Sequence, residues 1–268
     1  MINFEYKDFY TVQDFKRIIA VLRGEGGCPW DQEQTHESIR RNLLEEAYEV
    51  AEAIDERDAL HLREELGDLL MQVIFHARIE EEQGGFDLDG VADAACRKLI
   101  LRHPHVFGDV QVEDSAEVLR NWDDIKRAEK AQEGISDAID AVAKSLPALW
   151  RAEKIQDKAR KAGFDWPDVS GALDKLREEV SELEAAVRSG EGIADELGDV
   201  LFSVVNAARF LDVDPETALH GTCEKFAGRF RYIEEETTRQ GLNMVEMSLD
   251  DMEAFYQKAK KLENGEGL

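Results

Sequence analysis

The sequence predicts an all-α protein built from two copies of one helical domain. Apolar residues recur along most of the chain at the three- and four-residue spacing of a helix face, and the 268 residues include only five prolines and few alternating β-branched stretches. The predicted helices of the second half also follow one another in the same order as those of the first half. Such a repeat indicates an internal duplication.

The first half is predicted to form a short helix, a pair of long acidic helices and two further helices. The short helix has Thr11 as its N-cap and an apolar face that includes Phe15 and Leu22. A loop at residues 28–31 leads to the acidic pair, and Pro104 stops the helix that follows this pair. The five helices are expected at residues 11–23, 36–56, 59–82, 88–102 and 114–130.

The composition changes around residues 131–140, where small and polar residues follow the helical pattern. We therefore expect an N-terminal domain over residues 1–130, a linker over residues 131–142 and a C-terminal domain over residues 143–268.

The second half repeats the features of the first half in order. Gly163-Phe164-Asp165-Trp166 takes the position of residues 28–31, and glycines at 190 and 192 mark the turn between the two acidic helices. The helices of this half are expected at residues 170–188, 193–211, 215–237 and 248–262.

Each half carries one set of carboxylates with the same spacing, Glu-Glu-x-x-Glu on the first acidic helix and Glu-x-x-Asp on the second. The residues are Glu45, Glu46, Glu49, Glu65 and Asp68 in the first copy and Glu178, Glu179, Glu182, Glu196 and Asp199 in the second. If the two helices pack antiparallel, four or five carboxylates converge in each copy. Like charges at such short range raise carboxyl pKa values.

The second acidic helix of each copy is apolar over most of its circumference. In the second copy the polar side chains from Glu196 to Asn206 form one narrow stripe on this helix. A helix of this kind is usually buried, so its acids should be partly desolvated, which is costly unless a cation compensates their charge. Oxygen ligands without Cys or His predict Mg²⁺, or Mn²⁺ as a substitute, rather than zinc.

Basic and aromatic residues repeat in the same way on the last two helices of each half. The pairs are Lys98 with Arg102 and Trp122 with Lys126 in the first half, and Lys225 with Arg229 and Tyr256 with Lys260 in the second. Lys and Arg commonly neutralise phosphate oxygens, and an aromatic ring can stack on a base. With the carboxylates, these residues predict a Mg²⁺-dependent site for a nucleotide polyphosphate. Solvated helix charges and a packed aromatic residue are the alternative interpretation.

The composition also excludes several classes of function. There are 59 acidic and 33 basic residues, and a surface with a formal net charge of −26 repels the nucleic-acid backbone. No apolar stretch is long enough to span a membrane, the first residues lack a secretion pattern, and the three separated cysteines fit reduced thiols. We therefore expect a cytoplasmic protein that binds neither nucleic acid nor membranes.

Several motifs together resemble the MazG family of all-α NTP pyrophosphatases. They lie at residues 27–31, 34–36, 44–49 and 64–70 in the first half and at residues 163–166 and 196–199 in the second. The resemblance covers nearly the whole chain. It implies Mg²⁺-dependent hydrolysis of NTPs and dNTPs, with broad base tolerance, to NMP and pyrophosphate, as in nucleotide-pool house-cleaning. It also implies four-helix-bundle-like cores completed in a homodimer, and a regulatory protein partner.

By family position, the resemblance implies a role for each site residue of the second copy. The metal ligands would be Glu179, Glu182, Glu196 and Asp199, and Glu178 would orient or deprotonate the attacking water. The residues that take phosphate charge would be Lys175, Lys225, Arg229 and Lys260. The resemblance places Tyr256 at a position where a Trp is expected, which affects base stacking more than chemistry.

The two copies differ at positions that face the expected ligand. Asn42 stands where the second copy has Lys175, and Phe75 stands where it has Asn206. Phe75 removes a polar group from the end of the acid stripe, so Asn206 is a candidate substrate contact. We therefore expect the second half to be the main catalyst, and the first copy to bind metal, hydrolyse slowly or serve as a scaffold.

Two other functions fit the same residues. A narrower hydrolase, of the dUTPase or dCTPase kind, would use the same site and is distinguished by a substrate panel. A non-catalytic helical regulator that binds (p)ppGpp or a protein partner would show no metal-dependent turnover. A di-iron bundle needs Glu-x-x-His on two helices, whereas the Glu-x-x-His spacing occurs only at Glu33 and His36, outside the acidic helices.

Overall fold

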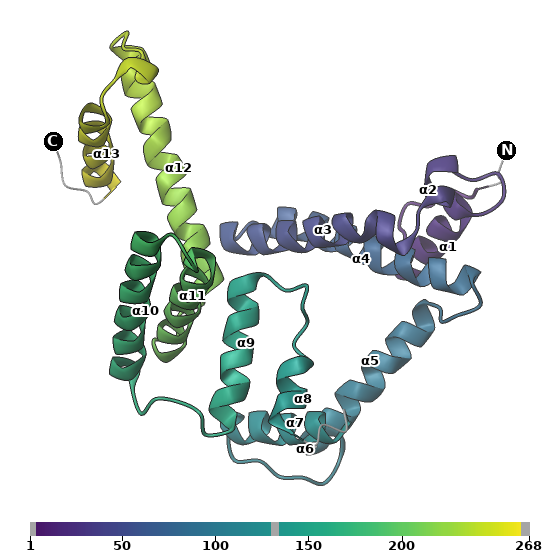
Figure 1. Ribbon diagram of the computed structural model, residues 1–268. Helices are drawn as coiled ribbons and strands as arrows, with labels where there is room; N and C mark the ends of the chain where they lie inside the picture. Colours follow the sequence, from purple (N-terminus) through teal and green to yellow (C-terminus); the bar gives the residue numbers. More distant parts are fainter. Residues whose placement is uncertain (1–3, 130–133, 264–268) are drawn as a thin grey trace. The chain divides into compact units, whose positions relative to one another are not determined.

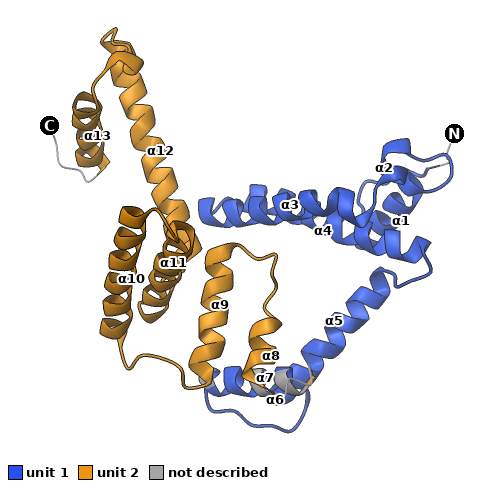
Figure 2. Ribbon diagram, viewed as in Figure 1, with its two compact units in different colours: residues 1–126 blue, residues 127–268 orange. Residues whose placement is uncertain are grey.

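The computed structural model describes residues 4–129 and 134–263, and the chain divides into two compact units, residues 1–126 and 127–268 (Figure 2). All regular elements among the described residues are helices, which confirms the predicted all-α fold (Figure 1). None of these helices is both long enough and apolar enough to cross a membrane.

Unit 1 is organised around the antiparallel pair of its two longest helices, α3 and α4 (Figure 1). Asp58 caps α4 by accepting hydrogen bonds from two backbone amides, so the pair is joined by a turn of only two residues. The helices are α1 Val12–Arg23, α2 Pro29–Glu33, α3 His36–Glu56, α4 Ala59–Glu82, α5 Leu88–Arg102, α6 Pro104–Phe107 and α7 Ser115–Glu129, the last of which spans the division between the units.

Unit 2 is organised around the corresponding pair, α10 and α11, against which α9 also packs. The predicted turn between the paired helices is confirmed, because Gly190 and Gly192 both have positive φ angles, of 80° and 71°. The helices are α8 Ile135–Asp140, α9 Ala148–Lys161, α10 Val169–Ser189, α11 Ile193–Phe210, α12 Pro215–Arg239 and α13 Leu249–Glu263, with a 3₁₀ turn at Met244–Glu246.

Four short or unexpected helices differ from the predicted pattern. The expected loop at residues 28–31 contains α2, and the break after α5 contains α6; each begins with a proline, which suits the first position of a helix. The segment assigned to a linker contains α8, which packs on α9, while residues 130–133 lie outside the described part of the chain. The fourth, α9, was not predicted.

The core of unit 1 is a cluster of large apolar side chains around α4. Phe75, which occupies the end of the acid stripe, is only 6% exposed in this cluster. Its buried neighbours are Ile19, Ile39, Ile74 and Ile79. The end of the stripe in the first copy is therefore part of the hydrophobic core.

The apolar surface of α11 is less buried than its sequence predicts. Leu197 and Leu201 are each 48% exposed, and Phe202 and Val204 are also exposed. In the single chain α11 is therefore only partly buried, because α9 and α10 cover only part of its circumference.

Candidate metal and nucleotide site

Three carboxylates of unit 2 converge between α10 and α11. One oxygen each of Glu179, Glu196 and Asp199 lies within 4.8 Å of the other two. Glu179 is 5% exposed, and its Oε2 atom is buried without a hydrogen-bond partner. The helix pair thus brings together acids from two different helices. The most buried of them, Glu179, lies on α10, whereas the sequence placed the desolvated acids on the polar stripe of α11.

Lys175 lies one turn before the Glu-Glu pair of α10. Its ammonium is 2.9 Å from Oε1 of Glu178 and 2.7 Å from Oε1 of Glu179. The hydrogen bond to Glu179, and then the one to Glu178, raise the pKa of Lys175. The lysine is therefore charged and neutralises part of the carboxylate cluster, leaving the second oxygen of Glu179 unpaired.

Glu182 lies at the edge of this cluster and is itself exposed. Desolvation raises its pKa, and the charge of Glu179 raises it further. This shift has the direction that the sequence predicts for crowded carboxylates.

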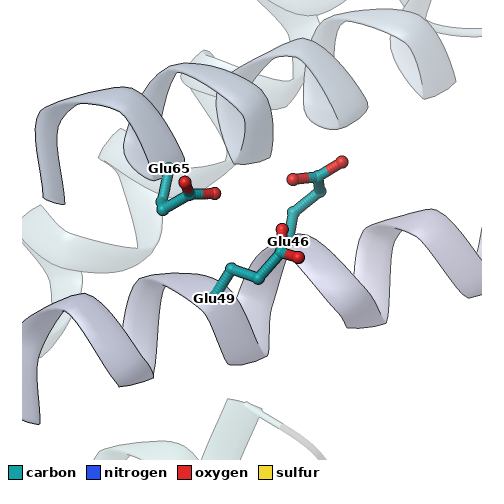
Figure 3. Close-up of side chains that lie close together, drawn as sticks. All are labelled: Glu46, Glu49 and Glu65. Atoms are coloured by element: carbon teal, nitrogen blue, oxygen red, sulfur yellow. The ribbon is translucent and has the colours of Figure 1, made fainter. Parts of the chain in front are cut away.

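The first copy forms a similar cluster in unit 1 from Glu46, Glu49 and Glu65, whose nearest oxygens also lie within 4.8 Å of one another (Figure 3). Desolvation raises the pKa of Glu46, and the charges of Asp68 and Glu49 add to it. Desolvation is likewise the main cause of the raised pKa of Glu65, which is 9% exposed. Acids are thus brought together in both copies, although Glu45 pairs instead with an arginine on the exposed surface of α3.

His61, which was not predicted as a site residue, lies beside the first cluster. His61 Nε2 is 3.2 Å from Oε1 of Glu65, one turn away on α4, and Nδ1 is 3.2 Å from Glu56. The hydrogen bond to Glu56 raises the pKa of His61. The spacing of four residues between His61 and Glu65 was the signal that could have identified it.

The basic residues of the second copy lie on α12 and α13. Arg229 is 2.8 Å from Glu263, donates to the hydroxyl of Tyr256 at 3.2 Å, and has its guanidinium carbon 5.3 Å from the centre of the Tyr256 ring. Lys225 and Lys260 are exposed. Figure 1 shows α13 beside the part of α12 that is farther from the α10–α11 pair, and α13 packs on α12.

The first copy repeats this arrangement, because the guanidinium of Arg102 lies 6.0 Å from the centre of the Trp122 ring. In both copies, an aromatic ring therefore lies beside an arginine of an earlier helix, Trp122 of α7 beside Arg102 of α5 and Tyr256 of α13 beside Arg229 of α12.

Asn206, the candidate substrate contact at the end of the acid stripe, lines a cavity of about 310 Å³ in unit 2. Its Oδ1 accepts hydrogen bonds from Nε and Nη2 of Arg209, at 3.2 and 2.8 Å. Arg209 in turn pairs with Asp165, which lowers the pKa of that carboxyl. Arg209 was not predicted as a site residue, although it continues the polar stripe of α11 three residues after Asn206.

Trp166, which also lines this cavity, packs against the first turn of α10. A Cβ atom at Gly171 would lie 2.9 Å from two atoms of the indole ring. Gly171→Ala is therefore expected to displace Trp166 and change its fluorescence emission. Gly221→Ala is the matched control, because a Cβ there has no neighbour within 4 Å; it should leave the emission unchanged and stabilise α12 by up to about 1 kcal/mol. An unchanged spectrum for Gly171→Ala would contradict this packing.

The donor atoms of both clusters fit a hard divalent cation. All are carboxylate oxygens, and in unit 2 one of them is a buried atom without a partner. Buried carboxylates are usually paired or bind a metal, and Mg²⁺ and Mn²⁺ prefer oxygen ligands.

A model of the MazG nucleotide pyrophosphohydrolase domain matches the chain twice, at residues 34–107 and 169–233. The chain belongs to the MazG family. The two MazG matches cover α3–α4 and α10–α11, which confirms the internal duplication, and the family is one of metal-dependent hydrolases.

Named relatives agree with the MazG assignment. The chain is 43% identical over 248 residues to the nucleoside triphosphate pyrophosphohydrolase/pyrophosphatase MazG of Thermotoga maritima, covering 92% of this chain and 95% of that protein. It is 44% identical over 255 residues to the nucleoside triphosphate pyrophosphohydrolase of Escherichia coli K12, covering 92% and 97%. It is also 48% identical over 261 residues to the uncharacterized protein YabN of Bacillus subtilis, covering 96% of this chain but only 53% of YabN.

Proposed function

We propose that unit 2 hydrolyses NTPs and dNTPs to NMP and pyrophosphate, with Mg²⁺ as its ion and Mn²⁺ as a substitute. The observation that carries this proposal is the cluster of Glu179, Glu196 and Asp199, whose most buried member has an unpaired oxygen. The names of the Thermotoga maritima and Escherichia coli relatives support the substrate class. Cytoplasmic house-cleaning of the nucleotide pool, with broad base tolerance, is the corresponding role.

The proposed roles of the carboxylates follow from their positions. The three clustered acids would hold the ion, with Glu182 at the edge completing the set. A bound ion polarises the α-phosphate and supplies an activated water. Glu178 is exposed and bonded to Lys175, so it is suited to orient the attacking water and accept its proton. Lys175 would exchange part of its carboxylate pairing for a phosphate oxygen.

The basic residues of α12 and α13 are proposed to take phosphate charge. Lys225 and Lys260 are exposed, and Arg229 is held by Tyr256 and Glu263. Tyr256 would then orient Arg229 rather than stack on the base.

We further propose a homodimer, because the single chain leaves apolar side chains of α11 exposed. Light scattering should give about twice the chain mass of 30.3 kDa. A mass of one chain would contradict the dimer. The acidic surface also suits a basic regulatory protein as a partner.

The test of the activity is pyrophosphate release from a panel of NTPs and dNTPs with Mg²⁺, with Mn²⁺, and after chelation. We expect turnover with either ion on several bases, and loss of turnover on chelation that added Mg²⁺ restores. Turnover with dUTP or dCTP alone would favour the narrower hydrolase. A protein that hydrolyses no nucleotide with either ion would contradict the proposed activity and favour a binding function.

A further inference from the structure

Two histidines join the long helices of unit 1 at the end of the pair opposite its turn, which we call the open end. His36 is the first residue of α3, and His76 lies in the C-terminal half of α4. Their rings are stacked, with centres 5.0 Å apart and planes inclined by 6°, and the two Nδ1 atoms are 2.7 Å apart. Figure 1 shows α1 and α2 at this end of the pair.

Glu80 determines how the hydrogens of the two rings are arranged. Its Oε1 lies 3.0 Å from Nε2 of His36, and because an ionised carboxylate only accepts hydrogen bonds, this nitrogen carries a hydrogen. A neutral His36 then has a lone pair on Nδ1, so the hydrogen between the two Nδ1 atoms belongs to His76. The fourth nitrogen, Nε2 of His76, is buried and has no hydrogen-bond partner among the described residues. The uncharged pair therefore uses every N–H that it has.

An additional proton has no suitable position in this arrangement. The contact between the two Nδ1 atoms holds one hydrogen, and Nε2 of His36 already has one, so an extra proton leaves an N–H group at Nε2 of His76. A buried N–H without an acceptor is costly. Burial, and then the charge of His36, accordingly lower the pKa of His76 below its ordinary value of 6.5. The closed pair resists protonation, whereas a separated pair accepts it.

The other charged groups at the open end are paired or already ionised. They are Lys16 and Arg23 on α1, Glu37 on α3, Glu82 on α4, and Asp87 and Asp89 at the start of α5. Arg23 is 2.8 Å from Glu82, and Lys16 is 3.0 Å from Asp87. Backbone hydrogen bonds lower the pKa values of Glu37 and Asp87. Although desolvation raises the pKa of Glu82, the hydrogen bond from Arg23 lowers it overall. These three carboxylates therefore stay ionised where histidine titrates.

Two comparisons within the chain distinguish the pair from other titrating groups. His61 lies at the other end of α4, and its hydrogen bond to Glu56 raises its pKa. Stability that comes from a raised pKa is present in acid and lost as the pH rises, which is the opposite of the effect at His76. In unit 2, Val169 and Ala207 stand at the positions of the two histidines when the acids of the copies are aligned.

We propose that His36 and His76 form a proton-sensitive latch, which holds the open end of the α3–α4 pair closed above about pH 6.5 and releases it in acid. Release separates the start of α3 from α4 and admits water to the core beside the latch, which includes Ile39 and Phe75. Unit 1 then responds to a change of pH that leaves the α10–α11 pair unaffected.

The test is hydrogen exchange of the full chain at about pH 7.5 and about pH 5.5, read by mass spectrometry. The results are expressed as protection factors, which remove the pH dependence of the intrinsic exchange rate. In His76→Asn the side-chain amide takes the place of the Nδ1–H group and does not titrate. His220→Asn makes the same change at an exposed histidine of α12 and is the matched control.

We expect acidification to lower the protection of the first turns of α3 and the last turns of α4 by up to about tenfold in the wild type and the control. This is the effect of one proton taken up on opening. His76→Asn should change by less than about twofold, and the α10–α11 pair should keep its protection in all three proteins. Equal protection of the wild type at both pH values, a loss that persists in His76→Asn, or the same loss in α10–α11 overturns the latch.

A second measurement decides the case if His76→Asn does not fold. NMR of the wild type with nitrogen-labelled histidine at about pH 7.5 should show a coupling between two imidazole nitrogens across their shared hydrogen. One of these rings should be in the Nδ1–H form and the other in the Nε2–H form. Absence of the coupling, or the same form in both rings, overturns the latch.

Discussion

Glu179→Gln is expected to lower Mg²⁺-dependent pyrophosphate release by roughly 100-fold or more. A metal ion contributes several kcal/mol to transition-state stabilisation, and each 1.36 kcal/mol corresponds to a factor of ten in rate. Glu179 is the most buried acid of the cluster and the one with an unpaired oxygen. Gln keeps the shape of the side chain, so the loss would reflect the missing charge rather than a missing contact. Steady-state kinetics and the affinity for Mn²⁺ measure the effect.

Glu46→Gln is the matched control, because it makes the same change at the equivalent position of the first copy. We expect its rate of pyrophosphate release to stay within about threefold of wild type, because the change lies in the first copy and leaves the proposed site of unit 2 intact. Equal losses in the two variants would mean that both copies turn over. Full activity of Glu179→Gln, with unchanged affinity for Mn²⁺, would contradict the role of this cluster as the metal site.

Phe75→Asn is expected to destabilise unit 1 by about 4 kcal/mol or more. Removing a buried phenylalanine ring costs roughly 3–5 kcal/mol, and the change also removes the contact of the ring with the Arg23 guanidinium, whose carbon lies 5.1 Å from the ring centre. Phe75 is 6% exposed among Ile19, Ile39, Ile74 and Ile79, which offer no hydrogen bonds through their side chains. Hydrogen exchange of the α4 amides should therefore become faster, as read by mass spectrometry.

The reciprocal change and an exposed control separate core packing from ligand binding. Asn206→Phe should weaken nucleotide binding in unit 2, whereas Phe86→Ala, at a residue 53% exposed, should change stability by no more than about 0.5 kcal/mol. Wild-type protection of α4 in Phe75→Asn would show that this position is not part of the core.

The helical pairs could be predicted because their information is local. Apolar spacing over about 20 residues defines a helix face, and turn residues such as Gly190 mark where the chain reverses. The short helices at α2 and α6 were not predicted, because a few residues that start with proline lack a periodic pattern. The helix α9 was not predicted either, because Leu149, Trp150 and Ile155 are the only large apolar residues among its 14, too few for a clear periodic face.

The sequence by itself determined the duplication, the carboxylate spacing and the inequality of the copies at Phe75 and Asn206. These features are residue identities at fixed intervals on single helices, and helix geometry converts such intervals into shared faces.

Only the tertiary structure decided which acid is buried, which basic side chain accompanies each cluster and where the cavity lies. Lys175 accompanies the second cluster and His61 the first. Gln156 and Phe202, 46 residues apart, meet in the cavity. Burial and pairing depend on which other segments pack against a helix face. The number of residues between two segments does not determine how far apart they lie in the folded chain, so the sequence alone does not give these contacts.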